Sequence, residues 1–91
     1  MKRVINGKIR DTDKMTLIIS DDNGLQVRDL YYADYSVYQD KDGALLLVDG
    51  CVRWHGNTGS YSEEMEQITK SELLERMEEW QTEPNEAIEK L

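Results

Sequence analysis

The acidic residues of this 91-residue chain are sorted by type along the sequence. All nine Asp lie between Asp11 and Asp49, whereas all ten Glu lie between Glu63 and Glu89. Asp side chains bond to nearby backbone groups and favour turns and caps, while Glu loses little rotamer freedom in a helix. The sequence therefore predicts strands and turns in the first half and helix in the last third.

Short apolar runs separated by turn signals predict the strands. The pair Asn6-Gly7 interrupts the first run, where it either reverses the chain or bulges the strand. The Asp-Lys-Asp-Gly sequence at residues 40–43 predicts the clearest hairpin, and Asp49-Gly50 predicts a further two-residue turn. The expected strands cover residues 3–9, 15–20, 25–32, 35–38, 44–48 and 51–55, and a flexible loop is expected at 56–60.

A capping box marks the start of the main helix. The Thr69 hydroxyl can accept the amide hydrogen of Glu72, and the Glu72 carboxylate can accept that of Thr69. The helix is expected over residues 70–81, with an apolar stripe on the sheet that consists of Leu73, Leu74, Met77 and Trp80. Pro84 cannot continue a helix through its interior but can begin another, so residues 85–90 are expected to form a short second helix or a frayed tail.

Together these patterns predict a single α+β domain over residues 1–91. Its sheet is expected to be an antiparallel meander of four to six strands, with the C-terminal amphipathic helix packed on one face and the short helix beyond it. No apolar run approaches the about 18 residues of a membrane-spanning helix. The lone Cys51 fits a reducing compartment, so a cytoplasmic protein is expected.

Cys51 and His55 are the only Cys and His, and Asp49 lies close to them in the sequence. In an extended strand the Cα atoms of Cys51 and His55 are ~13 Å apart, too far to share one ion unless the chain bends at Gly50 and Gly56. A packed thiol and a surface imidazole are therefore preferred, with a zinc site at Asp49, Cys51 and His55 as the alternative. The same separation argues against a Cys/His nucleophile pair, so no enzymatic activity and no other cofactor are expected.

Three segments carry a resemblance that spans roughly the whole chain. They are the MKRVINGK start at residues 1–8 followed by Asp11-Thr12, the Tyr-rich hairpin around Gly43, and Ile68-Thr69 at the opening of the main helix. In this order the chain resembles small acidic proteins carried by conjugative elements and prophages of Gram-positive bacteria. It departs from their pattern at Arg10, where an aromatic residue is expected, and at residues 51–59, which replace a Gly-rich segment. Several such proteins are anti-CRISPR inhibitors, so the resemblance implies binding to a Cas nuclease in a bacterial host cell.

The glutamates of the last third form a surface that fits such a partner. Five of them are spaced by 3, 4, 4 and 3 residues, namely Glu72, Glu75, Glu79, Glu83 and Glu86. On a helix they would form a row of carboxylates, one per ~5.4 Å turn, on the face away from Leu73, Met77 and Trp80. Such a row could enter a Lys/Arg-lined channel built for nucleic acid, or it could be only the solvated face of an amphipathic helix.

The formal net charge of −8 disfavours direct nucleic-acid binding. The N-terminal basic cluster is expected to flank an edge strand and to discourage aggregation; it consists of Lys2, Arg3, Lys8 and Arg10. Aromatic residues are expected to add partner contacts at Tyr35, Tyr38 and Trp54, because Tyr and Trp combine a large area with a polar group.

The expected function is that of a non-enzymatic inhibitor. It would bind an RNA-guided Cas nuclease through an acidic, Tyr-bearing surface and block nucleic-acid loading or a conformational step. The alternative is a structural or regulatory interaction protein of the mobile element's own transfer machinery, working as a homodimer paired through an edge strand.

Overall fold

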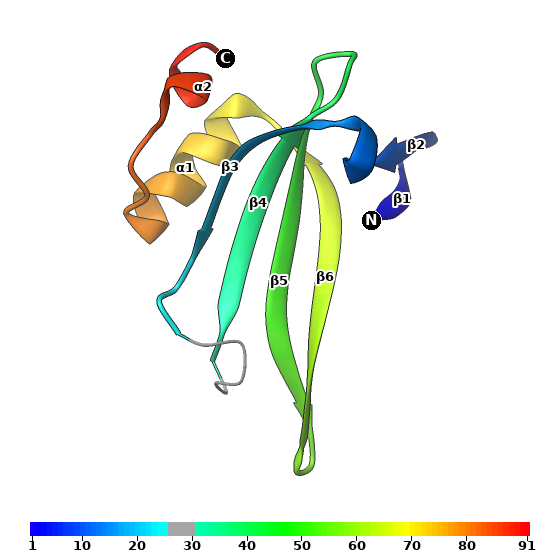
Figure 1. The fold of residues 1–91 in the computed structure, drawn as a ribbon, viewed down its shortest axis with the longest axis vertical. Coiled ribbons are helices and arrows are strands. Elements are labelled where there is room, and N and C mark those ends of the chain that lie inside the picture. Colours follow the sequence, from blue (N-terminus) through cyan, green and yellow to red (C-terminus); the bar gives the residue numbers. More distant parts are fainter. Residues whose placement is uncertain (26–30) are drawn as a thin grey trace.

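The chain has an α+β fold in the computed structural model, which describes residues 1–25 and 31–91. The elements are β1 (Lys2–Ile5), β2 (Lys8–Asp11), a 3-10 helix (Thr12–Lys14), β3 (Thr16–Asp22), β4 (Ala33–Gln39), β5 (Leu45–His55), β6 (Thr58–Ile68), α1 (Lys70–Trp80) and α2 (Glu86–Glu89). Four antiparallel strands form the main sheet in the order β3-β4-β5-β6, and β1 and β2 form a separate N-terminal ribbon (Figure 1). This arrangement confirms the predicted fold class.

The central strand β5 is buried on both faces over its first four residues. Leu45 and Leu47 point to the face on which α1 and α2 pack, here called the helix face. Leu46 and Val48 point to the opposite face, the ribbon face, where the N-terminal ribbon packs. The two cores therefore lie on opposite sides of one strand. Buried residues of the helix-face core include Ile19, Tyr35, Val37, Ile68, Leu73, Met77 and Ile88, and Met65 joins the ribbon-face core.

The main helix begins as the sequence predicts. Thr69 Oγ1 accepts a hydrogen bond from the Glu72 amide at 3.1 Å, and Glu72 Oε1 accepts one from the Thr69 amide at 3.1 Å. The helix ends before Gln81, which takes a left-handed conformation with φ 55°. The prediction that Leu74 packs on the sheet is wrong, because Leu74 points ~100° around the helix from buried Leu73 and is 44% exposed. Among the described residues, no helix is long and apolar enough to cross a membrane.

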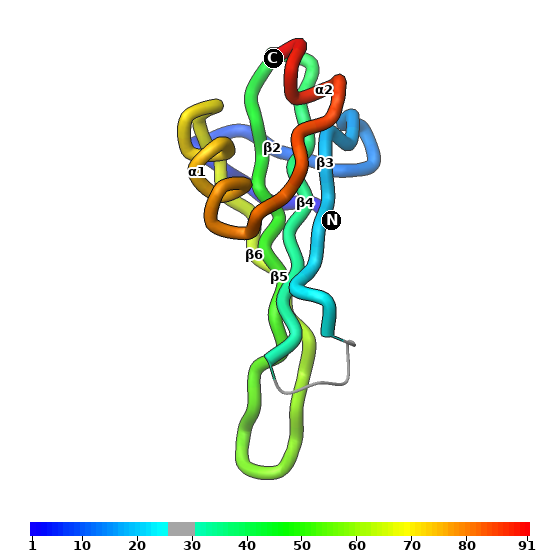
Figure 2. Tube along the Cα trace, turned by 90° about the vertical axis from the view of Figure 1, so that its left-hand side faces the viewer, coloured from blue at the N-terminus to red at the C-terminus, as the bar shows by residue number. Residues whose placement is uncertain are grey.

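The prediction of a turn at Asp49-Gly50 is wrong. Both residues lie inside β5, where Gly50 pairs with Asp34 of β4 on one side and with Glu63 of β6 on the other. Strand pairing on both sides holds the backbone extended in spite of the local turn signal. As a result β5 and β6 project beyond the helices as an arm of residues 50–63 (Figure 1, Figure 2).

Three other predictions concern turns and strands. The loop expected at residues 56–60 is only a two-residue turn at Gly56-Asn57, since Gly56 takes φ 64° and β6 begins at Thr58. Asn6-Gly7 reverses the chain between β1 and β2 and does not bulge a strand. Most of the strand expected at 25–32 falls on residues 26–30, which lie outside the described residues.

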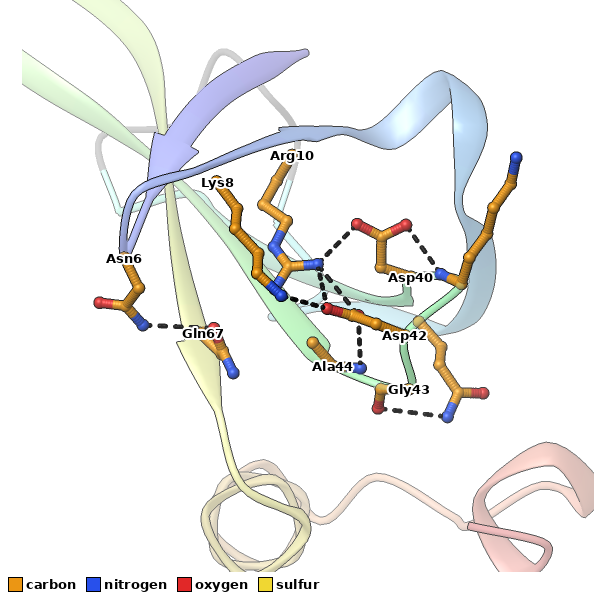
Figure 3. Close-up of polar contacts among 10 residues, drawn as sticks. Asn6, Lys8, Arg10, Asp40, Asp42, Gly43, Ala44 and Gln67 are labelled. Carbon is orange, nitrogen blue, oxygen red and sulfur yellow. Dashed lines mark hydrogen bonds and ion pairs between the residues drawn. The ribbon is translucent and has the colours of Figure 1, made fainter.

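Arg10 joins the N-terminal ribbon to the turn between β4 and β5 (Figure 3). Its Nη1 atom donates to Asp40 Oδ2 at 2.8 Å and to both carboxylate oxygens of Asp42 at 3.0 Å. Arg10 is 4% exposed, so the expectation that it discourages aggregation as one of the cluster's charges is wrong for this residue. Two carboxylates on one guanidinium supply the pairing that a buried charge requires.

These contacts lower the pKa values of both aspartates. The Ala44 amide and then the Arg10 guanidinium lower the pKa of Asp42 to about 2. The hydrogen bond from Arg10 is the main cause of the lowered pKa of Asp40. The two carboxylates therefore stabilise the fold above their ordinary pKa of ~3.9, and this stabilisation is lost as the pH falls through their lowered pKa values.

We expect Arg10→Met to make the free energy of unfolding less sensitive to acid. Without the guanidinium the pKa values of Asp40 and Asp42 move toward those of the unfolded chain, so stability falls less steeply from pH ~4 downward. Urea unfolding at a series of pH values, followed by Trp fluorescence, measures this slope. Lys2→Met is the control because the Lys2–Asp11 pair is long, at 4.0 Å, and exposed on the lysine side. The same slope in Arg10→Met as in the wild type would contradict the prediction.

Adjacent leucines of α1 test the orientation of the helix. Leu73 is fully buried, so Leu73→Ala should lower the free energy of unfolding by ~2 to 5 kcal/mol through lost burial and a new cavity. Leu74→Ala should change it by no more than ~0.5 kcal/mol, because Leu74 is largely exposed. Urea unfolding of both variants makes the comparison. Equal losses would mean that α1 does not pack through Leu73.

Candidate functional site

An acidic groove lies on the helix face between α1 and β6. Its carboxylates are Glu72, Glu75 and Glu79 of α1 and Glu66 of β6, with Arg76, Leu47 and Ile68 completing the lining. Three of the predicted row of glutamates therefore lie together, because residues spaced by three and four share one side of a helix. They line the groove toward β6. The sequence predicts a row on the face away from the buried residues. At 100° per residue only Glu75 is close to that position, ~160° from Leu73, whereas Glu72 and Glu79 lie ~100° and ~120° from it. Glu66 is missing from the prediction, since helical spacing carries no information about a neighbouring strand.

The one arginine that lines the groove, Arg76, forms its ion pair with Asp49 and not with the groove glutamates. Arg76 Nη2 lies 3.5 Å from Asp49 Oδ2, and the Arg76 guanidinium lies 6.0 Å from the centre of the Tyr35 ring. In the part of the chain that the structure describes, no Lys or Arg forms an ion pair with the four groove glutamates. Glu72 uses one oxygen for the helix cap. The remaining carboxylate oxygens can accept hydrogen bonds from a cationic partner.

The predicted row does not continue to Glu83 and Glu86. The left-handed residue Gln81 ends α1, and the chain after it is not helical until α2 begins at Glu86. Glu86 lies in this separate short helix and forms an ion pair with Lys90 at 3.1 Å. The expectation of five carboxylates on one helix is therefore wrong for these two.

The predicted aromatic contacts differ in exposure. Tyr35 is fully buried, with its ring edge-on to Trp80 at 4.8 Å and its hydroxyl 2.7 Å from Thr82 Oγ1, so its assignment as a partner contact is wrong. Burial also raises the pKa of Tyr35. Tyr38 is half-buried against the ribbon-face core. Trp54 is 42% exposed on the arm and is the one of the three that offers substantial area to a partner.

The structure does not bring together Asp49, Cys51 and His55. Cys51 and His55 lie four residues apart in one unbroken strand, and Asp49 pairs with Arg76 at 3.5 Å. The bend at Gly50 that a shared zinc site requires is not present, since Gly50 is paired on both sides. Across residues 1–25 and 31–91, no three His, Cys, Asp or Glu side chains lie close enough to hold a metal ion.

On the ribbon face of the arm, Tyr61 reaches across Gly50 to Asp34. A methyl group at Gly50 would come within 2.7 Å of Tyr61 Cζ, so only glycine admits the ring. The Tyr61 hydroxyl donates to the two Asp34 oxygens at 2.8 and 2.9 Å, and the Tyr32 hydroxyl donates to Asp34 Oδ2 at 2.8 Å. A glycine inside a strand is a sequence signal for such a close approach, but the local composition of Asp49-Gly50 favours a turn.

Trp54 makes a similar contact with Gly59. Trp54 pairs with Gly59 in the register of β5 and β6, and a methyl group at Gly59 would come within 2.9 Å of the indole ring. The rings of Tyr32 and Tyr61 lie 6.0 Å apart between centroids. Trp54 and Tyr61 are 42% and 39% exposed, so each ring is held against backbone while part of it remains open to solvent.

The Asp34 carboxylate keeps its two tyrosines protonated. The hydrogen bond to Asp34, followed by burial, raises the pKa of Tyr32 to about 12. Burial, followed by the hydrogen bond to Asp34, raises the pKa of Tyr61. Both phenols therefore remain hydrogen-bond donors at any physiological pH.

The acidic groove and the arm lie on opposite faces of the same sheet, and both present groups suited to recognition. The groove offers carboxylates, and the arm offers aromatic rings beside a carboxylate. Comparison of the chain with protein-family models, with curated proteins and with solved structures finds no match.

Removal of the Asp34 charge should lower the pKa values of Tyr32 and Tyr61. In Asp34→Asn we expect the pKa of Tyr32 to fall from about 12 toward its ordinary value of ~10. Because the pKa of Tyr32 is raised in the folded state, its stabilising effect is complete below pH ~10 and is lost as the pH rises toward 12. The variant should therefore lose less stability in this window than the wild type.

Tyrosinate absorbance at equilibrium, recorded against pH, measures this titration. Asp22→Asn is the matched control, because Asp22 has only a minor effect on the pKa of Tyr32 and no hydrogen bond to it. A titration of Asp34→Asn that coincides with that of the wild type would rule out the hydrogen-bonded arrangement.

Proposed function

We propose that the protein is a non-enzymatic inhibitor that binds a cationic nucleic-acid channel of an RNA-guided Cas nuclease and blocks nucleic-acid loading or a conformational step. The observation that carries the proposal is the acidic groove, whose four glutamates form no ion pair within the described residues. Unpaired carboxylates fixed on a helix and a neighbouring strand are complementary to the Lys and Arg side chains that line such a channel.

Physical chemistry supports the acidic groove as a binding surface. The first and last groove glutamates of α1, Glu72 and Glu79, lie seven residues apart, or ~10 Å at 1.5 Å per residue, so several cationic groups can be engaged at once. Arginine pairs with carboxylates through two parallel hydrogen bonds, which adds geometric specificity to the attraction. The formal net charge of −8 also steers the protein toward a cationic surface and raises the association rate at low salt.

The class of partner rests on the resemblance to anti-CRISPR proteins of mobile elements. The groove alone fits any nucleic-acid channel lined by Lys and Arg. Of the cationic channels in a bacterial host cell, that of an RNA-guided nuclease is the one that the resemblance indicates.

A second candidate function is an interaction protein of the mobile element's own transfer machinery that works as a homodimer. One observation favours it. Val4 and Ile9 lie directly opposite each other on the N-terminal ribbon, and each is 71% exposed. Such an exposed apolar pair could be covered by the same pair of a second copy.

Charge reversal in the acidic groove tests the proposed inhibitor. Glu75→Lys/Glu79→Lys should weaken binding to the nuclease ~10-fold or more, because it replaces attraction by repulsion at the contact. Glu78→Lys/Glu89→Lys is the matched control, since it changes the net charge by the same amount at exposed positions outside the groove lining. Affinity for a panel of purified Cas nucleases, with and without guide RNA, is measured at low and at high salt, together with DNA cleavage.

The outcomes separate the candidates. Equal weakening by both double variants would show that net charge alone acts and would contradict a role for the groove. No binding to any nuclease of the panel would contradict the inhibitor proposal. Concentration-dependent self-association in light scattering, abolished by Val4→Ser/Ile9→Ser, would then support the homodimer.

A further inference from the structure

We propose that the ribbon face of the arm is a second protein-binding surface, on which arginine side chains of the partner stack against Trp54 and Tyr61. The inference rests on the proposed function, because it takes the occupant to be the same cationic protein that the acidic groove contacts. It names the residue type that this partner would present on the opposite side of the sheet.

The two rings are prepared for such a contact before any partner arrives. Tyr61 is held over Gly50 by its hydrogen bonds to Asp34, and Trp54 is held against Gly59. Rings that are already fixed lose little conformational freedom on binding, and this is the property of aromatic residues that dominate protein interfaces. Trp54 is 42% exposed and Tyr61 is 39% exposed, which leaves ring area for a planar group to cover.

The charges around the rings favour a cation. The strand positions that alternate onto this face around the rings include Asp22, Asp34 and Glu63, and none of the described ones in this region carries Lys or Arg. Aromatic rings on a sheet can also stack nucleic-acid bases, but the phosphates that accompany bases would be repelled by these three carboxylates. A positively charged group gains from both the rings and the carboxylates.

Arginine fits this surface better than lysine. Its guanidinium is planar and stacks on aromatic faces, and it is more weakly hydrated than an ammonium group. The Asp34 oxygens already accept hydrogen bonds from the two tyrosines, so Asp34 acts through its charge and not as a free bidentate acceptor. The rings therefore supply the contact area, and the carboxylates supply the preference for a cation.

Synthetic octa-arginine and octa-lysine peptides provide the probe. Each is titrated into the ¹⁵N-labelled full-length protein, and amide and indole signals are followed by NMR. The Trp54 indole N–H signal and the Tyr61 amide signal should shift with octa-arginine and shift several-fold less with octa-lysine. The Trp80 indole, half-buried at the end of α1 against the helix-face core, is the internal reference. Shifts confined to the residues of the acidic groove, or equal shifts of Trp54 with the two peptides, would overturn the proposal.

Two variants separate this surface from the acidic groove. Trp54→Leu should weaken the octa-arginine affinity measured at the Tyr61 amide roughly threefold to tenfold, while amide signals outside the arm confirm that the fold is kept. Glu75→Lys/Glu79→Lys should leave the shift of the Trp54 indole unchanged. If Trp54→Leu binds as tightly as the wild type, the arm proposal fails and the proposed function is unaffected. If the Trp54 shift persists but no nuclease is bound, the proposed function fails.

Discussion

Strand β5 determines the rest of the structure, because its first four residues are buried on both faces and need a cover on each. Full burial of a leucine or valine side chain contributes ~1.5 to 3 kcal/mol, so a sheet with one bare face would lose much of its stability. The covers come from opposite ends of the chain. The C-terminal helices cover the helix face from the Thr69–Glu72 cap onward, and Arg10 ties the N-terminal ribbon to the β4–β5 turn on the other side.

Beyond Asp49 neither cover is present, yet β5 and β6 remain paired to the tip of the arm. Glycine and aromatic residues replace the core there. Tyr61 packs over Gly50 and Trp54 packs against Gly59, so each ring covers backbone that would otherwise face water. Trp54 and Tyr61 nevertheless remain 42% and 39% exposed. Exposed aromatic area on the arm is thus a consequence of extending two strands past the two cores, and it creates a surface that a partner can use.

Prediction from the sequence succeeds where the deciding contact is local and fails where it is distant. The capping box that starts α1 involves Thr69 and Glu72 alone, and the sequence predicts it correctly. Asp49-Gly50 has the composition of a turn, but its pairing with β4 and β6 keeps it extended. The burial of Arg10 depends on carboxylates 30 and 32 residues away. Helical spacing identified the α1 side of the acidic groove, whereas Glu66 enters from a strand that only the fold places beside the helix.

The molecule is thin, so the acidic groove and the aromatic surface of the arm lie a short distance apart on its two sides. The extents are 42 × 30 × 19 Å, and the acidic groove and the arm rings lie on opposite sides of the sheet. A partner that grips the protein in a cleft therefore meets carboxylates on one side and aromatic rings beside carboxylates on the other. Lys and Arg are common to both walls of a channel built around nucleic acid, because phosphates face outward on every side of a strand. A protein with anion-bearing surfaces on two faces suits such a channel better than one that is acidic on a single face. In the proposed binding mode the arm must hold its rings in place, and the close contacts of Tyr61 with Gly50 and of Trp54 with Gly59 favour this.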